Sequence, residues 1–393
     1  MPAKRAVTGE VLRYAHPFFT NTAPESRPQI QALHAKRMSD FIHKKLGPIP
    51  APSRTPVMDL EEIIGKQGMD DIAGAGAIRF QATGDTGNEK SGEHQEEVAG
   101  AMAKDFTPGA DASNPAFFLH LGDVIYGPGK DQEYRDEFYR PYMKYPGKIV
   151  AIAGNHDGEV YAGTDPKPLR AFLSNFCAPR AEVPTIAADV RIFRQTMTQP
   201  GVYWLLQAPF VNIIGLYSNI AEGPGDLTGA NGDKKQLQWL AKSLSDLKKA
   251  KDKGDVRALI IATHHPPFSE GGHSGSTVML NQIDQACKDA GIQPHAMLAG
   301  HAHNYQRYTR KVGDSEMACL VAGCGGHNDS DVKPAKRQKV GDAVFEASRK
   351  GFGYLRITVD KKQLRIDMMA VPDTGVASQF DTVTVDIATH RVH

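Results

Sequence analysis

Beginning near residue 77, short apolar runs alternate with polar turns that contain glycine. Apolar runs that stop abruptly at such turns are typical of β-strands buried in a sheet. The predicted strands are Ile78 to Thr83, Phe117 to Leu121, Lys148 to Ala153, Val211 to Ser218, Val256 to Ala262 and Ala296 to Ala299. Between them, apolar residues recur at helical spacing in Gln236 to Lys249 and Val278 to Ala290. This alternation of strands and helices predicts a mixed α/β fold.

The C-terminal part of the chain has a different pattern. Cys319 to Ala322 is a further predicted strand, and the basic stretch Asn328 to Gly341 that follows is interpreted as a solvated loop. Beyond it, Gly353 to Val359, Gln363 to Ala370 and Thr382 to Ile387 alternate between apolar and polar residues in the manner of strands. Their close succession predicts an antiparallel portion of a second sheet.

Residues 1–75 read as an N-terminal extension to a main domain at 76–393. The extension contains a candidate helix from Gln29 to Lys45, with its apolar residues loosely on one face, and a proline-rich linker from Pro48 to Pro56. No recognisable chemistry lies in this region, so we expect it to pack as a strap over the main domain. A role in substrate gating or in a dimer contact is the alternative.

Composition and charge exclude several classes of protein. The chain of 393 residues is 40% hydrophobic and 23% charged, as is ordinary for a globular protein. Its formal net charge of +1 provides no overall field that would attract nucleic acid or a membrane surface. The four cysteines are too sparse for a disulfide scaffold and lack a short metal-binding spacing. Without an evident apolar targeting or membrane-spanning segment, we expect a cytoplasmic protein.

Five of the polar turns carry side chains that can bind metals. They read GDTG at 84–87, GDVIYG at 122–127, GNHD at 154–157, HHPPF at 264–268 and GHAH at 300–303. Each follows a predicted strand, and α/β sheets place their ligands at the carboxyl ends of strands. Carboxylate, amide, imidazole and phenol donors together suit iron, manganese or zinc better than calcium. Taken singly, these residues could be helix caps, turn residues or core histidines, but their order after five strands indicates one metal site.

In this order the motifs resemble those of the calcineurin-like metallophosphoesterases, and in particular those of the purple acid phosphatase branch. AGCGG at 322–326 and GFGYLRI near residue 351 also look like later signatures of the family. The resemblance implies a four-layer αββα sandwich, in which two mixed β-sheets are flanked by helices, with 76–393 as the catalytic domain. It also implies a site with two metal ions.

Carried over position by position, the resemblance implies a ligand set for each ion, with Asp123 bridging both. The first ion would bind Asp85, Asp123, Tyr126 and His303. The second would bind Asp123, Asn155, His264 and His301. Gly87 stands where most of the family has a metal-binding histidine, and Tyr126 stands where the purple branch binds ferric iron through tyrosinate. The implied metals are therefore Fe(III) and a divalent iron, zinc or manganese ion.

Three further residues are expected to support the chemistry. His156 matches the family's outer-sphere histidine, which contacts the phosphate or its leaving group. His273 lies nine residues after His264, in a glycine-rich segment, and matches a second substrate histidine of the purple branch. Asp157 is expected to orient His156 or a metal ligand, as carboxylates often do around imidazoles.

Some of these assignments have open alternatives. Tyr126 could line the pocket without its hydroxyl meeting a metal. His273 could be a solvated loop residue without a role. The adjacent His265 could replace His264 as the ligand if the register of the strand differed.

The implied reaction is hydrolysis of a small-molecule phosphate monoester. The metals would bind phosphate oxygens, lower the pKa of a bound water and align the resulting hydroxide for in-line attack on phosphorus. His156 and His273 would stabilise the developing charge or protonate the leaving alkoxide. One alternative is a divalent-metal phosphodiesterase of the same superfamily that acts on cyclic nucleotides or other diesters. Another is a metal-binding scaffold that has lost catalysis.

Overall fold

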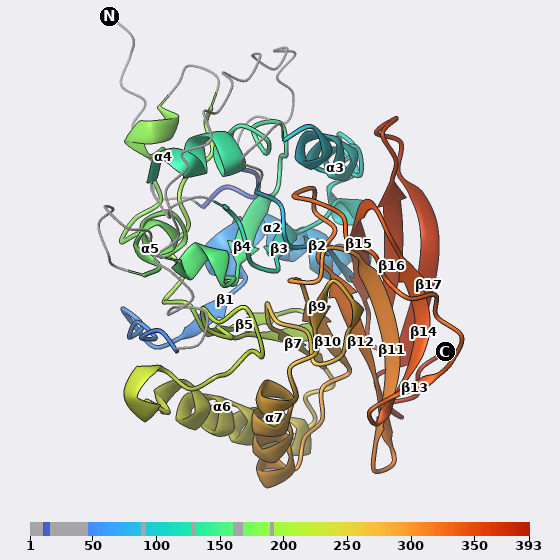
Figure 1. Cartoon of the computed structure of the whole chain (residues 1–393). Helices are drawn as coiled ribbons and strands as arrows, with labels where there is room; N and C mark the ends of the chain where they lie inside the picture. Colours follow the sequence, from blue (N-terminus) through green and yellow to red (C-terminus); the bar gives the residue numbers. More distant parts are fainter. Residues whose placement is uncertain (1–10, 16–45, 88–91, 127–130, 160–167, 189–191) are drawn as a thin grey trace, which may run out of the picture.

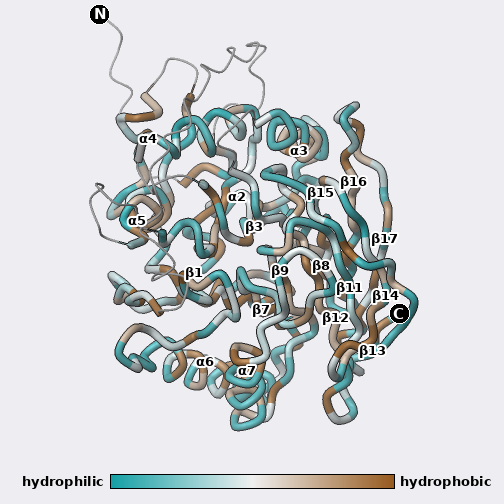
Figure 2. Tube along the Cα trace, viewed as in Figure 1, coloured by the Kyte–Doolittle hydropathy of each residue, from teal (hydrophilic) through white to brown (hydrophobic). Residues whose placement is uncertain are grey.

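Two β-sheets face each other and helices cover both outer sides of the pair (Figure 1). The structure, a computed structural model, describes residues 11–15, 46–87, 92–126, 131–159, 168–188 and 192–393. Buried apolar side chains in these ranges form three clusters, one between the sheets and one beneath the helices on each outer side. Figure 2 shows apolar residues concentrated along the central strands. The predicted four-layer αββα sandwich is confirmed.

Within the described residues, the larger sheet has nine strands and is parallel at its centre. The central strands are buried along their whole length and consist of small and aliphatic residues, as expected for strands covered on both faces. In spatial order the strands are β1 (Val57–Asp59), β5 (Trp204–Ala208), β6 (Val211–Gly215), β7 (Ala258–Ala262), β10 (Ala296–Ala299), β12 (Ser315–Ala322), β11 (Tyr305–Val312), β14 (Ala343–Arg349) and β13 (Lys339–Val340).

The smaller sheet has six strands in the part of the chain that the structure describes. Three adjacent strands are parallel and the rest are antiparallel. In spatial order they are β17 (Ser378–Asp386), β16 (Gln363–Val371), β15 (Phe352–Val359), β2 (Ile78–Thr83), β3 (Phe117–His120) and β4 (Lys148–Ala151). The predicted antiparallel C-terminal portion therefore extends the sheet that begins with β2. A separate short hairpin pairs β8 (Glu270–Gly271) with β9 (His273–Ser274).

Most of the helices lie on the outer faces of the two sheets, whereas α2 (Glu61–Ala75) contributes Ile63, Ile64 and Ile72 to the cluster between them. On the side of the larger sheet, α6 (Lys235–Asp252) and α7 (Thr277–Ala290) bury their apolar stripes, as their periodicity predicts. The remaining helices are α2 (Glu61–Ala75), α3 (Glu93–Ala103), α4 (Asp131–Tyr134), which continues into a π-helical turn at Arg135–Tyr139, and α5 (Arg170–Phe176). No helix among the described ranges is both long enough and apolar enough to cross a bilayer.

The described parts of the N-terminal extension pack against the rest of the chain. Arg13 forms a largely buried ion pair with Asp71 inside the extension, and the Tyr14 hydroxyl donates a hydrogen bond to Asp111 of the main domain. After the proline-rich linker, β1 pairs in parallel with β5 and α2 follows. The candidate helix from Gln29 to Lys45 lies outside the described residues, and the division of the chain at residue 75 stays a prediction.

Lys148, at the start of β4, carries an unfavourable, partly buried charge. Burial and the nearby Arg194 guanidinium lower the pKa of Lys148 from 10.5 to about 8. Because the unfolded chain binds this proton more tightly, the penalty is complete below pH 8 and disappears as the pH rises toward 10.5.

Replacing Lys148 with methionine is therefore expected to raise the free energy of unfolding at pH 7 by about 2 kcal/mol. The gain should fall toward zero near pH 10, and thermal unfolding at both pH values measures it. The matched control is Lys144→Met, since Lys144 is exposed. Equal gains at both pH values would contradict the assignment of the penalty to charge.

Candidate metal centre

Five turns converge where the carboxyl ends of parallel strands from both sheets meet. Asp85, Asp123 and Asn155 follow β2, β3 and β4, while His264 and His301 follow β7 and β10. Backbone hydrogen bonds link the turns, since the Asp85 amide donates to Gly122 O and the Gly300 amide donates to His264 O. The turns of the two sheets are joined as well, because the His301 amide donates to Asp85 Oδ2 at 2.7 Å.

Three of the predicted ligands have an unusual backbone. Asp85, Asp123 and His301 have φ values of 58°, 51° and 67°, in the left-handed region that side chains other than glycine seldom adopt. Such conformations persist where the surrounding structure enforces them, and they concentrate at functional sites. The turns are also close together, because a Cβ atom on Gly154 would lie 2.0 Å from Asp123 Oδ1. Glycine is therefore required beside the carboxylate.

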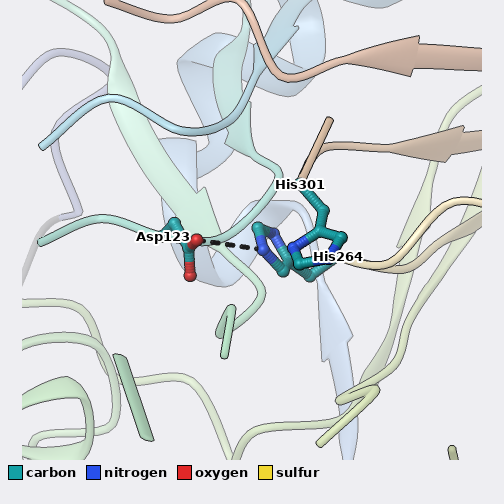
Figure 3. A group of neighbouring side chains, drawn as sticks. All are labelled: Asp123, His264 and His301. Atoms are coloured by element: carbon teal, nitrogen blue, oxygen red, sulfur yellow. Dashed lines mark ion pairs between the residues drawn. The ribbon is translucent and has the colours of Figure 1, made fainter. Parts of the chain in front are cut away.

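Asp123, His264 and His301 form a compact group of potential ligands in which every residue is buried (Figure 3). Their ligand atoms all lie within 4.8 Å of one another, and the residues are 1%, 0% and 2% exposed. His264 Nε2 is 3.1 Å from Asp123 Oδ2 and 3.0 Å from Asn155 Oδ1. The structure thus brings together the four residues expected around the second ion.

Hydrogen bonds to backbone carbonyls fix which ring nitrogen of each histidine can bind a metal. His264 Nδ1 donates to Leu121 O at 2.9 Å, which leaves the Nε2 lone pair toward Asp123. His301 Nε2 donates to Glu222 O at 2.9 Å, which leaves its Nδ1 lone pair. Support of this kind orients imidazole ligands in metal sites.

The residues expected around the first ion also lie together. The Tyr126 hydroxyl is 3.1 Å from Asp85 Oδ1 and 3.2 Å from His303 Nε2, and the latter is 3.4 Å from Asp85 Oδ1. The hydroxyl therefore meets two of the predicted ligands rather than merely lining a pocket. Burial and the carboxylates of Asp85 and Asp123 raise the pKa of Tyr126 well above its ordinary value. Without a cation at this position, the phenol stays protonated.

Of the two adjacent histidines, the geometry favours His264 as the ligand. Both ring nitrogens of His265 already have partners, with Nδ1 2.8 Å from Ser218 Oγ and Nε2 donating to Ala221 O at 2.8 Å. Burial lowers the pKa of His265 to about 3, so the ring is neutral. His265 therefore holds the loop after β6 rather than pointing at Asp123.

His156 lies against the centre, but its carboxylate partner is Glu159 rather than Asp157. His156 Nδ1 is 3.0 Å from Glu159 Oε2, and its backbone amide donates to Asp123 Oδ1 at 2.9 Å. Burial alone would lower the pKa of His156, but Asp123 and Glu159 outweigh it and raise the pKa to about 9. The ring is therefore a cation at neutral pH in this arrangement.

Asp157 supports the backbone of the turns. Its carboxylate accepts hydrogen bonds from the amides of Gly154 at 2.8 Å and Val124 at 3.2 Å. It thus fixes the turns that carry Asp123 and Asn155, which fits the expected orienting of metal ligands. Burial and the nearby Asp123 carboxylate raise the pKa of Asp157 to about 7.

His273 faces the cluster from the β8–β9 hairpin. Its ring centroid is 4.1 Å from that of His301 and 5.7 Å from that of His303. His273 Nδ1 is 3.6 Å from Glu222 Oε1. The contacts with two predicted ligands place His273 at the centre rather than in open solvent.

Several residues at this site were missed by the sequence analysis. Glu159 and Glu222 carry no motif signal, and Glu222 reaches the site only through the loop after β6. His327 follows the AGCGG turn, stacks on Tyr126 at 3.3 Å between ring centroids, and has Nδ1 2.5 Å from Gly87 O. The AGCGG turn before His327 was the available sequence signal for this histidine. The separation of His327 from the other motifs in the sequence does not indicate that it stacks on Tyr126.

The carboxylate, amide and imidazole donors of this centre are suited to binding cations. Asp85 and Asp123 are buried, and the ion pairs described for them are with histidines and include no lysine or arginine. Within the described ranges, Asp123 Oδ2 has no well-aligned hydrogen-bond donor, and Asn155 Nδ2 has no hydrogen-bond acceptor. Buried carboxylates without such partners are stable when they bind metal ions. Two overlapping donor sets joined at Asp123 could hold two ions.

Comparisons with known proteins agree with this architecture. The calcineurin-like phosphoesterase family model matches residues 78–305, which include all five turns. Human tartrate-resistant acid phosphatase type 5 is 26% identical over 301 residues, which cover 72% of this chain and 84% of the human protein.

Solved structures share the fold at low sequence identity. Purple acid phosphatase PPD1 from yellow lupin matches with a TM-score of 0.53 and 14% identity over 86% of this chain and 55% of the lupin chain, so this chain spans about half of that protein. GAP50 of Plasmodium, described as the anchor in the inner membrane complex, matches with a TM-score of 0.56 and 13% identity over 79% and 89% of the two chains.

Proposed function

Because the chain belongs to the calcineurin-like phosphoesterase family, and is thus a phosphoric ester hydrolase of the purple acid phosphatase-like type, we propose that it hydrolyses phosphate monoesters at a site for two metal ions. The observation that carries this proposal is that the predicted ligands lie together, with Asp123 and Asn155 beside His264, and with Asp85 beside Tyr126 and His303. The substrate is a small-molecule phosphate ester.

When bound, two cations at these positions would polarise phosphate oxygens and lower the pKa of a coordinated water. The chain would hold the first cation with Asp85, Asp123, Tyr126 and His303. It would hold the second with Asp123, Asn155, His264 and His301. The buried ligands also exclude bulk water, which strengthens electrostatic interactions with the phosphate.

The protein supplies the proton chemistry from the two outer histidines. Since His156 Nδ1 donates to Glu159, its second proton resides on Nε2, the atom available to a phosphate oxygen or to the leaving oxygen. His273 lies beside His301 and offers a second ring at the same position. We assign both to stabilising the transition-state charge and to protonating the leaving alkoxide.

We assign Fe(III) to the position that contains Tyr126 and a divalent iron, zinc or manganese ion to the other. A phenol between two carboxylates ionises only beside a strong cation, and a trivalent ion is the more effective one. Two carboxylates and a tyrosinate then offset three of the five positive charges.

Purified protein is therefore expected to be pink or purple, and Tyr126→Phe should remove the colour. Absorption spectra and metal analysis of both proteins measure this. Tyr217→Phe is the matched control, because Tyr217 is equally buried but belongs to neither donor set. Active, colourless protein that contains only zinc or manganese would overturn the ferric assignment.

The competing functions are distinguished by one assay. A divalent-metal phosphodiesterase would prefer a chromogenic diester over its monoester counterpart, whereas the proposed enzyme prefers the monoester. A non-catalytic scaffold would hydrolyse neither. The fold alone does not distinguish an enzyme from a scaffold, since GAP50, described as an anchor, shares the fold. In this chain, however, a suitable residue occupies every expected ligand position. A cytoplasmic location and the absence of a nucleic-acid partner stay predictions.

A further inference from the structure

Exposure increases sharply from one end of the metal centre to the other. The side chains of Asp123 and His264 are 1% and 0% exposed. His303 is 14% exposed, whereas His273 and Glu222 reach 31% and 38%. The exposed side chains mark the opening of the site. A phosphate held at the buried end would therefore direct its ester group past His273 and Glu222.

Glu222 places a carboxylate directly at this opening. Its Oε1 is 3.6 Å from His273 Nδ1, and its carboxylate forms a group with His156 and Glu159 whose ligand atoms lie within 4.8 Å of one another. Two carboxylates thus accompany the two histidines that would meet the leaving group.

The loop that carries Glu222 is held in place by buried hydrogen bonds. Asn219 Oδ1 accepts from the Gly47 amide at 2.7 Å, and its Nδ2 donates to Thr228 O at 2.9 Å. His265 Nε2 donates to Ala221 O, immediately before Glu222. The backbone of Glu222 is itself bound, because its carbonyl accepts from His301 Nε2. The carboxylate is therefore presented from a fixed loop and not from a free surface segment.

We propose that Glu222 selects substrates by the charge of the leaving group. This inference rests on the proposed phosphomonoesterase activity. A leaving group with an ammonium two or three carbons from the ester oxygen would be attracted to the carboxylate. One with a further phosphate or carboxylate would be repelled by Glu222, since the Glu159 carboxylate is paired with His156. Discrimination of this kind arises from attraction to one substrate and repulsion of another. The favoured class is therefore aminoalkyl phosphates.

The test compares 2-aminoethyl phosphate with propyl phosphate, which has a similar shape and an uncharged end. The ratio of their kcat/KM values is measured for the full-length, metal-loaded protein and for Glu222→Gln, which keeps the carbonyl that binds His301. We expect the ratio to fall about tenfold in the variant, mainly through KM for the amine. Glu270→Gln is the matched control, because Glu270 lies on the β8–β9 hairpin and pairs with Lys333 at 2.7 Å. Its ratio should stay within about twofold of the wild type.

An unchanged ratio in Glu222→Gln, or an equal fall in Glu270→Gln, would overturn the role of Glu222. If the variant turns over too slowly, calorimetric binding of 2-aminoethylphosphonate and propylphosphonate gives the same comparison without catalysis. Failure of the wild type to hydrolyse a chromogenic monoester would instead overturn the proposed function. The two failures are therefore distinguishable.

Discussion

Replacement of Asp123 with alanine is expected to lower kcat/KM for a phosphomonoester by about 10³-fold or more and to release both metal ions. Asp123 is the only predicted ligand shared by both donor sets, so its loss weakens both positions at once. Its Oδ2 faces His264 Nε2 at 3.1 Å, while Oδ1 accepts from the His156 amide. Activity assays and metal analysis of the purified variant measure the two effects.

The matched control removes a different, partly buried carboxylate of the same domain. Asp105 accepts hydrogen bonds from Gln81 Nε2 and the Tyr354 hydroxyl, both at 2.8 Å, and contacts none of the predicted ligands. Asp105→Ala should lower stability but keep the metal content and kcat/KM near wild type. Full activity in Asp123→Ala, or equal metal loss in Asp105→Ala, would contradict the assignment of Asp123 as the bridging ligand.

The sequence predicted the central strands well because their apolar runs are local and complete. The predicted bounds of β2 and β10 agree with the structure, and β7 begins two residues later than predicted. The motifs lie at the ends of these strands, so predicting the strands also predicted where the ligands would converge. The parallel pairing of the central strands then follows from the fold class that the motifs implied.

The elements missed by the sequence analysis depend on tertiary contacts. β1 has three residues and forms by pairing with β5. α2 contains Gly65 in a left-handed conformation, with φ of 69°, so helical periodicity is interrupted. Tyr305, two residues after the GHAH turn, begins β11, and its hydroxyl donates a hydrogen bond to Asp381. None of these pairings has a local signal in the chain.

The residues of the metal centre also divide into those with a local sequence signal and those that depend on tertiary contacts. The candidate ligands were found because they follow predicted strands in motifs that resemble those of the family. Glu159, Glu222 and His327 act through side-chain contacts made only after folding, so no periodicity reports them. The pairing of His156 with Glu159 rather than Asp157 depends on a 3₁₀ turn at His156–Gly158, which sequence spacing alone does not specify.

Substituting His264 and His265 separately is expected to give opposite outcomes. His264→Ala should lower kcat/KM about 10²- to 10³-fold and reduce the metal content, because His264 Nε2 faces Asp123 and Asn155. His265→Ala should keep both metals, because its ring nitrogens contact Ser218 and Ala221 instead. Metal analysis and chromogenic assays of the two variants measure the difference.

Because His264 and His265 are adjacent, the two variants together test which of the two rings the turn after β7 presents to Asp123. His265→Ala leaves the buried Ala221 carbonyl without its donor, so thermal unfolding should show a loss of about 1–3 kcal/mol while metal binding persists. His264→Ala should instead affect the metal-loaded protein most, because the metals stabilise the folded state by binding it. Chelation should therefore bring the unfolding temperatures of wild type and His264→Ala closer together. Metal loss in His265→Ala with retention in His264→Ala would mean that the turn after β7 presents the other ring to Asp123.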